Sequence, residues 1–324
     1  MSSIDSVRDT TGNRAVGTAR TDTERSVETA LAAIQPWHGK RLEYAPVLGG
    51  LQNSNWRITV EGTDTRYFLK IPGAGSETFI DRALANEAAR RAGVKGIGPE
   101  LVHFDPATGV EVIEFLEGYR ACTNGDFKNV DVPRQIIDIY RELHDGELLT
   151  VTKTMFDMID EHLAQANELD VKLPQDIELI LGEYQVAKQA LLASGLDLAA
   201  CHNDPMPGNF LVADGEPMKL VDYEFASNNE RAYELALLTT EMFYTEELIN
   251  ELVEDFYGRA DFGLLARVQV CGALADTKWG LWACVNQQLS SAWDFDYHKY
   301  GCWKLMRARL KMSDPRWPFW LKAL

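Results

Sequence analysis

Three polar residues in the second half of the chain have the types and spacing that phosphoryl transfer requires. Asp204 and Asn209 are close in sequence, and Asp222 follows after a short apolar run. Phosphoryl transfer needs a carboxylate that orients an attacking hydroxyl and accepts its proton, and oxygen ligands that hold Mg²⁺ against the nucleotide phosphates. The pattern predicts a small-molecule kinase that uses ATP and Mg²⁺, with Asp204 as catalytic base and Asn209 and Asp222 as metal ligands.

The sequence between Asn209 and Asp222 favours this interpretation over that of an ordinary polar turn. Residues 210–212 and 218–221 read as two short strands, and the connection between them contains an Asp-Gly pair, which is a hairpin turn signal. A hairpin would place Asn209 at its entrance and Asp222 at its exit, close enough to share one metal ion. In a polar turn between core strands, Asp204 and Asn209 would be turn residues only.

A second magnesium motif, at residues 261–263, is rejected. These residues spell the Asp-Phe-Gly triplet of protein kinases, but they lie far downstream of Asp204 and between two helical patterns. Asp261 precedes the pattern that starts at Leu264, and we therefore predict that it is a helix N-cap.

The N-terminal third has the order of elements expected for a nucleotide cradle. Residues 41–44 and 56–60 predict two strands joined by a loop of small residues. Glycine lets backbone N–H groups approach phosphate oxygens closely, and Asn and Ser side chains add hydrogen-bond donors. The candidate phosphate-binding residues are Gly50, Asn53 and Ser54. The loop lacks a G-x-G-x-x-G motif, so by itself it would equally fit an ordinary hairpin.

Lys70 lies among the apolar residues of the next predicted strand, residues 66–71. An isolated Lys in a strand usually faces solvent, but after a glycine loop and two strands it stands where kinases place the Lys that holds the α- and β-phosphates. Residues 77–92 follow as a helical pattern, and Glu87 within it is the candidate ion-pair partner of Lys70. The competing candidates for that role are Glu77, Asp81 and Glu100.

Residues 110–118 predict a strand that ends in a hinge, where the backbone of Glu114 and Leu116 is expected to hydrogen-bond the adenine edge. Strands come before this point and mainly helices after it, which predicts an α+β, bilobal fold with the site in the cleft between the lobes. We expect a flexible N-terminal segment, a nucleotide-binding N-lobe and a catalytic C-lobe at residues 1–23, 24–117 and 118–324. The expected C-lobe helices cover residues 132–144, 155–167, 174–194, 233–243, 246–257 and 264–293.

Composition limits the class of protein. The chain has 324 residues, of which 46% are hydrophobic, so it can bury one large or two moderate cores. It has no apolar run of about 18 residues and no signal-peptide pattern, and its five cysteines have no metal or disulfide spacing. These features predict a cytoplasmic protein without membrane insertion. The net charge of −17 argues against nucleic acid as the main partner and is compatible with a cationic substrate.

Aromatic residues are concentrated near the C-terminus. Trp279 and Trp282 are three apart in a helical pattern and share one face, and Tyr297 follows soon after. Aromatic faces attract a quaternary ammonium, which cannot donate hydrogen bonds, and Glu241 is a candidate counter-charge. Trp at helical spacing is more often part of a core than of a ligand cage, so spacing alone leaves both interpretations open. Three further tryptophans are expected to be packing residues: Trp303, Trp317 and Trp320.

The chain resembles the choline/ethanolamine kinase family, within the aminoglycoside phosphotransferase superfamily of protein-kinase-like folds. The resemblance covers residues 48–300, and its most specific parts are His202-Asn203-Asp204, Gly208-Asn209, Asp222-Tyr223-Glu224 and Trp279-Gly280-Leu281-Trp282. It implies transfer of the ATP γ-phosphoryl group to the hydroxyl of a small cationic amino alcohol. It also implies the roles given above for Asp204, Asn209, Asp222 and Lys70, a ring cage of Trp279, Trp282 and Tyr297, and Glu241 as an acidic pocket residue. Glu234 stands where the family usually has Asp.

Choline is the first expected substrate, because a closed ring cage suits a quaternary ammonium. Ethanolamine would need acceptors for its ammonium hydrogens, and Glu241, Asp276 or Asp296 facing the pocket would favour it. An aminoglycoside-type phosphotransferase would need a wide acidic groove. A non-catalytic pseudokinase that binds an amine is disfavoured, because the full set of catalytic residues is present. The sequence leaves the oligomeric state open, a homodimer included.

Overall fold

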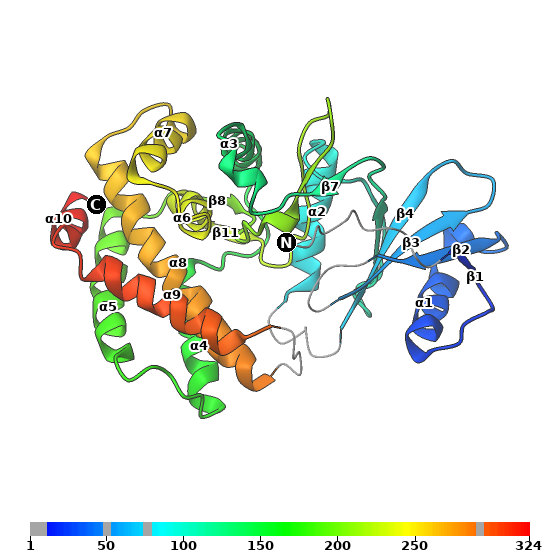
Figure 1. Cartoon of the computed structure of the whole chain (residues 1–324), viewed down its shortest axis with the longest axis horizontal. Helices are drawn as coiled ribbons and strands as arrows, with labels where there is room; N and C mark the ends of the chain where they lie inside the picture. Colours follow the sequence, from blue (N-terminus) through cyan, green and yellow to red (C-terminus); the bar gives the residue numbers. More distant parts are fainter. Residues whose placement is uncertain (1–11, 48–52, 74–79, 290–294) are drawn as a thin grey trace, which may run out of the picture. The chain divides into compact units, whose positions relative to one another are not determined.

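The computed structural model describes residues 12–47, 53–73, 80–289 and 295–324, and the chain divides into two compact units (Figure 1). The first unit consists of Met1–Arg120 and Val212–Glu224, and the second of Ala121–Leu211 and Phe225–Leu324. The chain passes between the units within β7 (Arg120–Ala121) and β9 (Phe210–Val212). The return of Val212–Glu224 to the first unit, which also contains β10 (Lys219–Leu220), has no counterpart in the sequence-based division at residue 118.

The first unit contains an antiparallel sheet with the strand order β1-β2-β3-β4-β6-β5. Its helices are α1 (Asp22–Ala33) and α2 (Arg82–Val94), with a short 3₁₀ turn, η1 (Gln35–Trp37), after α1. The strands are β1 (Arg14–Ala15), β2 (Leu42–Pro46), β3 (Asn53–Val60), β4 (Arg66–Pro72), β5 (Leu101–Phe104) and β6 (Glu111–Glu114). This sheet and the mainly helical second unit confirm the predicted α+β class.

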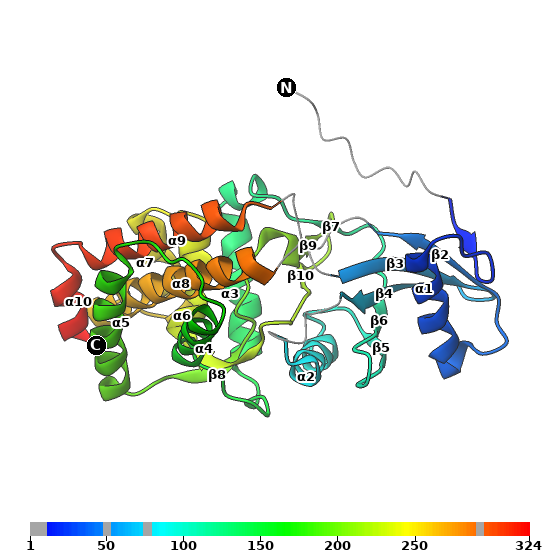
Figure 2. The same ribbon diagram turned by 90° about the horizontal axis from the view of Figure 1, so that it is seen from below.

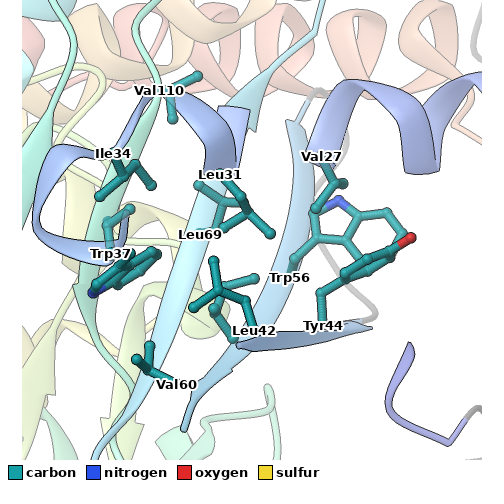
Figure 3. Packing of buried hydrophobic residues seen from close by; sticks show 12 residues of the cluster. Val27, Leu31, Ile34, Trp37, Leu42, Tyr44, Trp56, Val60, Leu69 and Val110 are labelled. Carbon is teal, nitrogen blue, oxygen red and sulfur yellow. The ribbon is translucent and has the colours of Figure 1, made fainter. Parts of the chain in front are cut away.

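One face of this sheet packs against α1. Trp56, Ile58 and Val60 are buried at every second position of β3, as expected when alternate side chains point to one face. Figure 3 shows Val27 and Leu31 of α1 facing the side chains of the sheet. This core holds β3 and β4 rigidly, and these strands carry the residues predicted to contact the nucleotide phosphates.

The N-terminal part of the described chain is attached to this unit. β1 pairs with β2, with Arg14 opposite Tyr44. Thr21 then starts α1 with a capping box, in which its hydroxyl accepts from the N–H of Glu24 and the Glu24 carboxylate accepts from the N–H of Thr21. Helix α1 was not predicted, because few apolar positions mark its buried side; Val27 is one of them.

The second unit is built around α8 (Phe262–Leu289), whose middle is buried on all sides (Figures 1 and 2). Helices α4, α6, α9 and α10 all pack against α8. None of the helices within the described ranges is both long and apolar enough to span a bilayer. The other helices are α3 (Asp131–His144), α4 (Met155–Glu168), α5 (Ile177–Ser194), α6 (Arg231–Glu241), α7 (Glu246–Tyr257), α9 (Tyr297–Met312) and α10 (Trp317–Ala323), with 3₁₀ turns η3 (Asp126–Lys128) and η4 (Pro207–Asn209).

Two glycines allow α9 to approach α8 closely. A Cβ atom at Gly280 would lie 2.6 Å from Leu305 Cγ, and a Cβ at Gly301 would lie 3.0 Å from the carbonyl oxygen of Gly280. A larger residue at Gly280 would therefore push the helices apart. Because Trp279 and Trp282 are on α8 and Tyr297 begins α9, this close approach fixes where their rings meet.

Within the described residues, the predicted helices of the second unit are confirmed, with shifts of a few residues at their ends; positions 290–293 of the last predicted helix lie outside the described residues. Asp261 caps α8 as expected, since its Oδ1 accepts from the N–H of Leu264 at 2.9 Å. Trp317 and Trp320 are buried as predicted, whereas the prediction for Trp303 is wrong, because 58% of its side chain is exposed. Trp303 lies on the outer face of α9, which the sequence analysis did not predict as a helix.

Candidate active site

Asp204 follows strand β8 (Leu198–Cys201), and a buried carboxylate holds the intervening backbone. The N–H groups of His202 and Asn203 both donate to Glu234 Oε1, at 2.8 and 2.7 Å. Asn203 has a φ of 65°, a left-handed conformation that Asn adopts more readily than most residues. The turn into Asp204 is therefore fixed by residue type at Asn203 and by two hydrogen bonds to Glu234.

Glu234 itself is fully buried on α6 and is held by His144, whose Nε2 donates to Glu234 Oε2 at 2.7 Å. Burial raises the pKa of Glu234, but the hydrogen bond and charge of His144 and the backbone N–H of Asn203 outweigh burial and hold it below its usual value. Cys201 Sγ lies 3.6 Å from His144 Nε2, so His144, Cys201 and Glu234 are close enough together to resemble a metal site. Both Glu234 oxygens already accept hydrogen bonds, which identifies the residue as an anchor for the catalytic loop.

Asn209 is held against Asp204. It ends the 3₁₀ turn η4 (Pro207–Asn209), and its Nδ2 donates to both the backbone oxygen and the Oδ2 of Asp204, each at 3.1 Å. This use of Nδ2 leaves Oδ1 as the amide atom that can coordinate a cation. The structure thus brings the predicted base and one predicted metal ligand together in the second unit.

The first unit contains the second cluster of predicted residues. Lys70 Nζ lies 2.7 Å from Asp222 Oδ1 and 2.5 Å from Glu224 Oε1. Asn53 Nδ2 donates to Glu224 Oε1 at 2.8 Å, and Glu111 lies opposite Lys70 in the pairing of β4 with β6. The Asp-x-Glu segment is therefore tied to the sheet through Lys70. Sequence analysis missed Glu111 and the role of Glu224.

These carboxylates change the ionisation of the cluster. Burial lowers the pKa of Lys70, but the Asp222 and Glu224 carboxylates raise it above its usual value, so Lys70 is protonated. Burial raises the pKa of Glu111, and the charge of Lys70 opposes that rise. One ammonium thus faces several acidic side chains, and carboxylate oxygens are the ligand type that Mg²⁺ prefers.

Asp222 has a φ of 65°, which is uncommon for a residue with a side chain and often marks a functional position. Its carboxylate fits the predicted role of metal ligand, and so does the Oδ1 of Asn209. Because Asn209 and Asp222 belong to different units, their sharing of one Mg²⁺ stays a prediction.

The predicted phosphate loop is only partly described. Gly50 lies outside the described residues. Ser54 begins β3 together with Asn53, and its Oγ accepts from Trp56 Nε1 at 2.7 Å. The side chains of Asn53 and Ser54 are thus both engaged within the first unit, and their binding to phosphate stays a prediction.

The other residues predicted to serve nucleotide binding lie within the described part of the chain. Glu114 ends β6, and its N–H donates to the carbonyl oxygen of Glu100 at 2.9 Å. The carbonyl oxygen of Leu116 accepts from the N–H of Tyr119 at 3.3 Å. Glu87 lies on α2 and forms an ion pair with Arg91 at 2.5 Å. Adenine binding by Glu114 and Leu116, and pairing of Glu87 with Lys70, stay predictions.

The three predicted aromatic residues, which are buried, and the partly buried Phe225 form one group, the ring cluster: Phe225, Trp279, Trp282 and Tyr297. The centroid distances are 5.1 Å for Phe225–Trp279, 5.2 Å for Trp279–Trp282 and 5.6 Å for Trp282–Tyr297. Each pair meets edge to face, the arrangement that aromatic quadrupoles favour. Phe225 directly follows the Asp-x-Glu segment, which links the cluster to the catalytic sequence.

The carboxylates predicted to serve this site already have partners. Glu241 forms an ion pair with Lys304 of α9, and Asp276 forms ion pairs with Lys304 and Arg307. Asp296 caps α9 by accepting from the N–H of Lys299 at 2.9 Å. Glu241 therefore lies at the end of α6 as part of an internal charge network, and its contact with substrate stays a prediction.

Sequence analysis missed Lys278, which lies on α8 next to Trp279. Its Nζ is 3.0 Å from the centroid of the Trp279 ring and 4.4 Å from that of Phe225. The side chain is buried, and its Nζ has no hydrogen-bond partner among the described residues. Burial lowers the pKa of Lys278 well below its usual value, and the charge of Asp204 is the strongest opposing influence. A lone Lys in the most apolar part of a helical pattern was the signal available in the sequence.

Comparisons with known proteins show the family and the fold of the chain. The family model described as choline/ethanolamine kinase matches residues 44–253. A choline/ethanolamine kinase family protein from Mesorhizobium loti is 31% identical, with a TM-score of 0.77 over 93% of this chain and 98% of that structure. Choline kinase LicA from Streptococcus pneumoniae has the same fold at 20% identity, with a TM-score of 0.72 over 90% of this chain and 99% of that structure. Protein LicA of Haemophilus influenzae is 22% identical over 74% of this chain and 73% of its own length.

Proposed function

Because the chain belongs to the choline/ethanolamine kinase family and is a phosphotransferase that acts on an alcohol group, we propose that it transfers the γ-phosphoryl group of ATP to the hydroxyl of choline. The observation that carries the proposal is that the second unit holds both Asp204 with its Asn209 partner and the cluster of four aromatic rings. The Asp204–Asn209 pair would supply the chemistry, and the ring cluster would supply a surface for a quaternary ammonium.

Asp204 orients the acceptor hydroxyl and accepts its proton as the phosphoryl group is transferred. Its position is set by Asn209 on one side and, through the backbone of His202 and Asn203, by Glu234 on the other. A carboxylate held in place before substrate binds needs little reorganisation during the reaction. A shift of the Glu234 anchor would therefore impair catalysis without removing any reacting group.

The nucleotide side of the reaction is assigned to Lys70, Asp222 and Asn209. Lys70 binds the α- and β-phosphates as a protonated ammonium, and the side-chain oxygens of Asp222 and Asn209 would hold Mg²⁺. When bound, Mg²⁺ would supply positive charge that neutralises the charge developing on the phosphate oxygens. Phosphates that bind Lys70 would compete with its present ion pairs and free Asp222 for the metal.

Choline is preferred over ethanolamine because of how the nearby carboxylates are used. Ethanolamine presents three ammonium hydrogens that need acceptors, yet Glu241 and Asp276 are ion-paired with Lys304 and Arg307. The rings offer faces rather than acceptors, which suits a methylated ammonium. Because ATP is the phosphoryl donor and all five cysteines are free thiols, we place the activity in the cytoplasm.

A coupled ADP-release assay with ATP and Mg²⁺ tests the proposal on ethanolamine, its N-methylated intermediates, choline and one aminoglycoside. We expect kcat/KM to increase with each added methyl group and the aminoglycoside to be inactive. The variant Asp204→Asn, which keeps the size of the side chain, is the matched control and should show no turnover. A preference for ethanolamine would show that hydrogen-bond acceptors, and not ring faces, recognise the ammonium group. Absence of turnover on every compound would reject the assigned substrate.

A further inference from the structure

The ring cluster already contains an amine of the protein itself. Lys278 Nζ lies 3.0 Å from the centroid of the Trp279 ring and 4.4 Å from that of Phe225. Both distances are within the range in which an ammonium is attracted to a ring face. One face of the Trp279 ring is therefore occupied by the amine of Lys278.

The burial of Lys278 is unusual for this residue type. Lysine is almost never fully buried without a partner, yet its side chain is 1% exposed, and no hydrogen bond to Nζ is present within the described part of the chain. A long polar side chain would normally extend to water. The rings are thus the principal surroundings of this amine, and any occupant of the cluster must share them with it.

Charges on the neighbouring elements do not compensate Lys278 directly. On α6 and α9, Glu241 is ion-paired with Lys304. On α4, Glu161 is ion-paired with Lys153 at 2.6 Å. Asp204 on the catalytic loop is the acidic group whose charge most favours the protonated form of Lys278. The amine is thus coupled to the same carboxylate that is proposed to bind the acceptor hydroxyl.

We propose that Lys278 is a specificity-determining residue, whose amine occupies the Trp279 face and weakens the binding of quaternary ammonium compounds. This inference rests on the proposed function, because it concerns the same amine-binding site. It means that choline must displace the amine from the ring, by a movement of the Lys278 side chain, before its trimethylammonium group can make full contact. A residue without an amine at this position removes that competition.

Tetramethylammonium is the probe, because it carries the cation of choline but no hydroxyl and cannot be phosphorylated. Its Kd is measured by isothermal titration calorimetry on the full chain and on the variants Lys278→Ala and Lys278→Met. Alanine clears the ring face, whereas methionine keeps the packing and removes the amine, so a folding defect in one variant still leaves the other to be measured. Lys299→Ala is the matched control, because Lys299 Nζ lies 5.0 Å from the ring of Trp303 on the exposed face of α9.

We expect the Kd for tetramethylammonium to decrease about tenfold in the Lys278 variants and to be unchanged in Lys299→Ala. An unchanged or higher Kd in both Lys278 variants would overturn the inference. The result is independent of turnover. Tighter binding in a protein that phosphorylates no amino alcohol would retain the role of Lys278 and reject the proposed function. Choline turnover together with equal Kd values for tetramethylammonium in all the proteins would support the proposed function and reject the role of Lys278.

Discussion

Replacing Lys278 by methionine should stabilise the protein, because the amine is buried without a hydrogen-bond partner among the described residues. Burial of an unpaired polar group costs about 1–3 kcal/mol by mutational data. Contact of a protonated amine with Trp279 and Phe225 returns about 0.5–2 kcal/mol, but burial also lowers the pKa of Lys278 and so makes the protonated form costly. Methionine fills a similar volume without the amine. We expect a net gain of about 1 kcal/mol, or roughly 2–4 °C in Tm for a unit of this size.

The pH dependence of this stability gain distinguishes an effect of the Lys278 amine from an effect of improved packing. The pKa of Lys278 is lowered in the folded state, so between that pKa and about 10.4 the unfolded chain binds a proton that the folded chain lacks. In this window the stability of the parent protein increases with pH through Lys278, and the methionine variant lacks that contribution. The difference between the two proteins should therefore narrow as the pH rises from 7 toward 10.

Thermal unfolding followed by circular dichroism at several pH values measures both effects. Lys299→Met, on the exposed surface of α9, is the control and should stay within about 0.5 kcal/mol of the parent. A Lys278→Met variant that is less stable than the parent, or a difference that does not change with pH, would show that the amine is paired in the folded protein and would refute the reasoning.

Three further predictions concern the catalytic machinery. Asp204→Ala should abolish turnover and leave ATP binding nearly intact; ADP-release kinetics and nucleotide titration test this, and normal turnover would remove Asp204 as the base. Trp282→Ala should raise the KM for choline at least tenfold with little change in the KM for ATP, whereas an equal effect on both would indicate a purely structural ring. Glu234→Gln should lower kcat more than it raises either KM and cost about 1–3 kcal/mol of stability, because its hydrogen bond with His144 loses a charged acceptor. Restoration of kcat by Glu234→Asp would support a positioning role, and an unchanged kcat in Glu234→Gln would exclude one.

The sequence predicted best those parts of the site that lie in one continuous segment. Asp204 and Asn209 contact each other because a short 3₁₀ turn closes the loop between them, and their spacing made this foreseeable. Trp279 and Trp282 share a face of α8 for the same local reason. Helical period and turn chemistry act over a few residues, so a pattern in the sequence contains them.

Contacts between segments that are distant in the sequence were harder to predict. Glu224 binds Lys70 across 154 positions of sequence, and the local motif that contains Glu224 does not indicate this partner. Helix α9 was missed because basic residues are spread among its apolar ones and obscure a buried face, and one of these, Lys304, is buried in ion pairs with Glu241 and Asp276. A buried charge reads as a solvent-facing residue until its partners are known.

The charge network behind the rings bears on how the proposed site distinguishes its substrate. Lys304 and Arg307 neutralise Glu241 and Asp276, so these acidic residues offer little net attraction to an incoming cation. Ring faces and the carboxylate of Asp204 then remain to attract it, and Lys278 competes for both. Because Asp204 is also proposed to hold the acceptor hydroxyl, an amino alcohol that contacts both the rings and Asp204 would bind more tightly than a simple cation. Selectivity for an alcohol over an unreactive amine would follow from this shared use of Asp204.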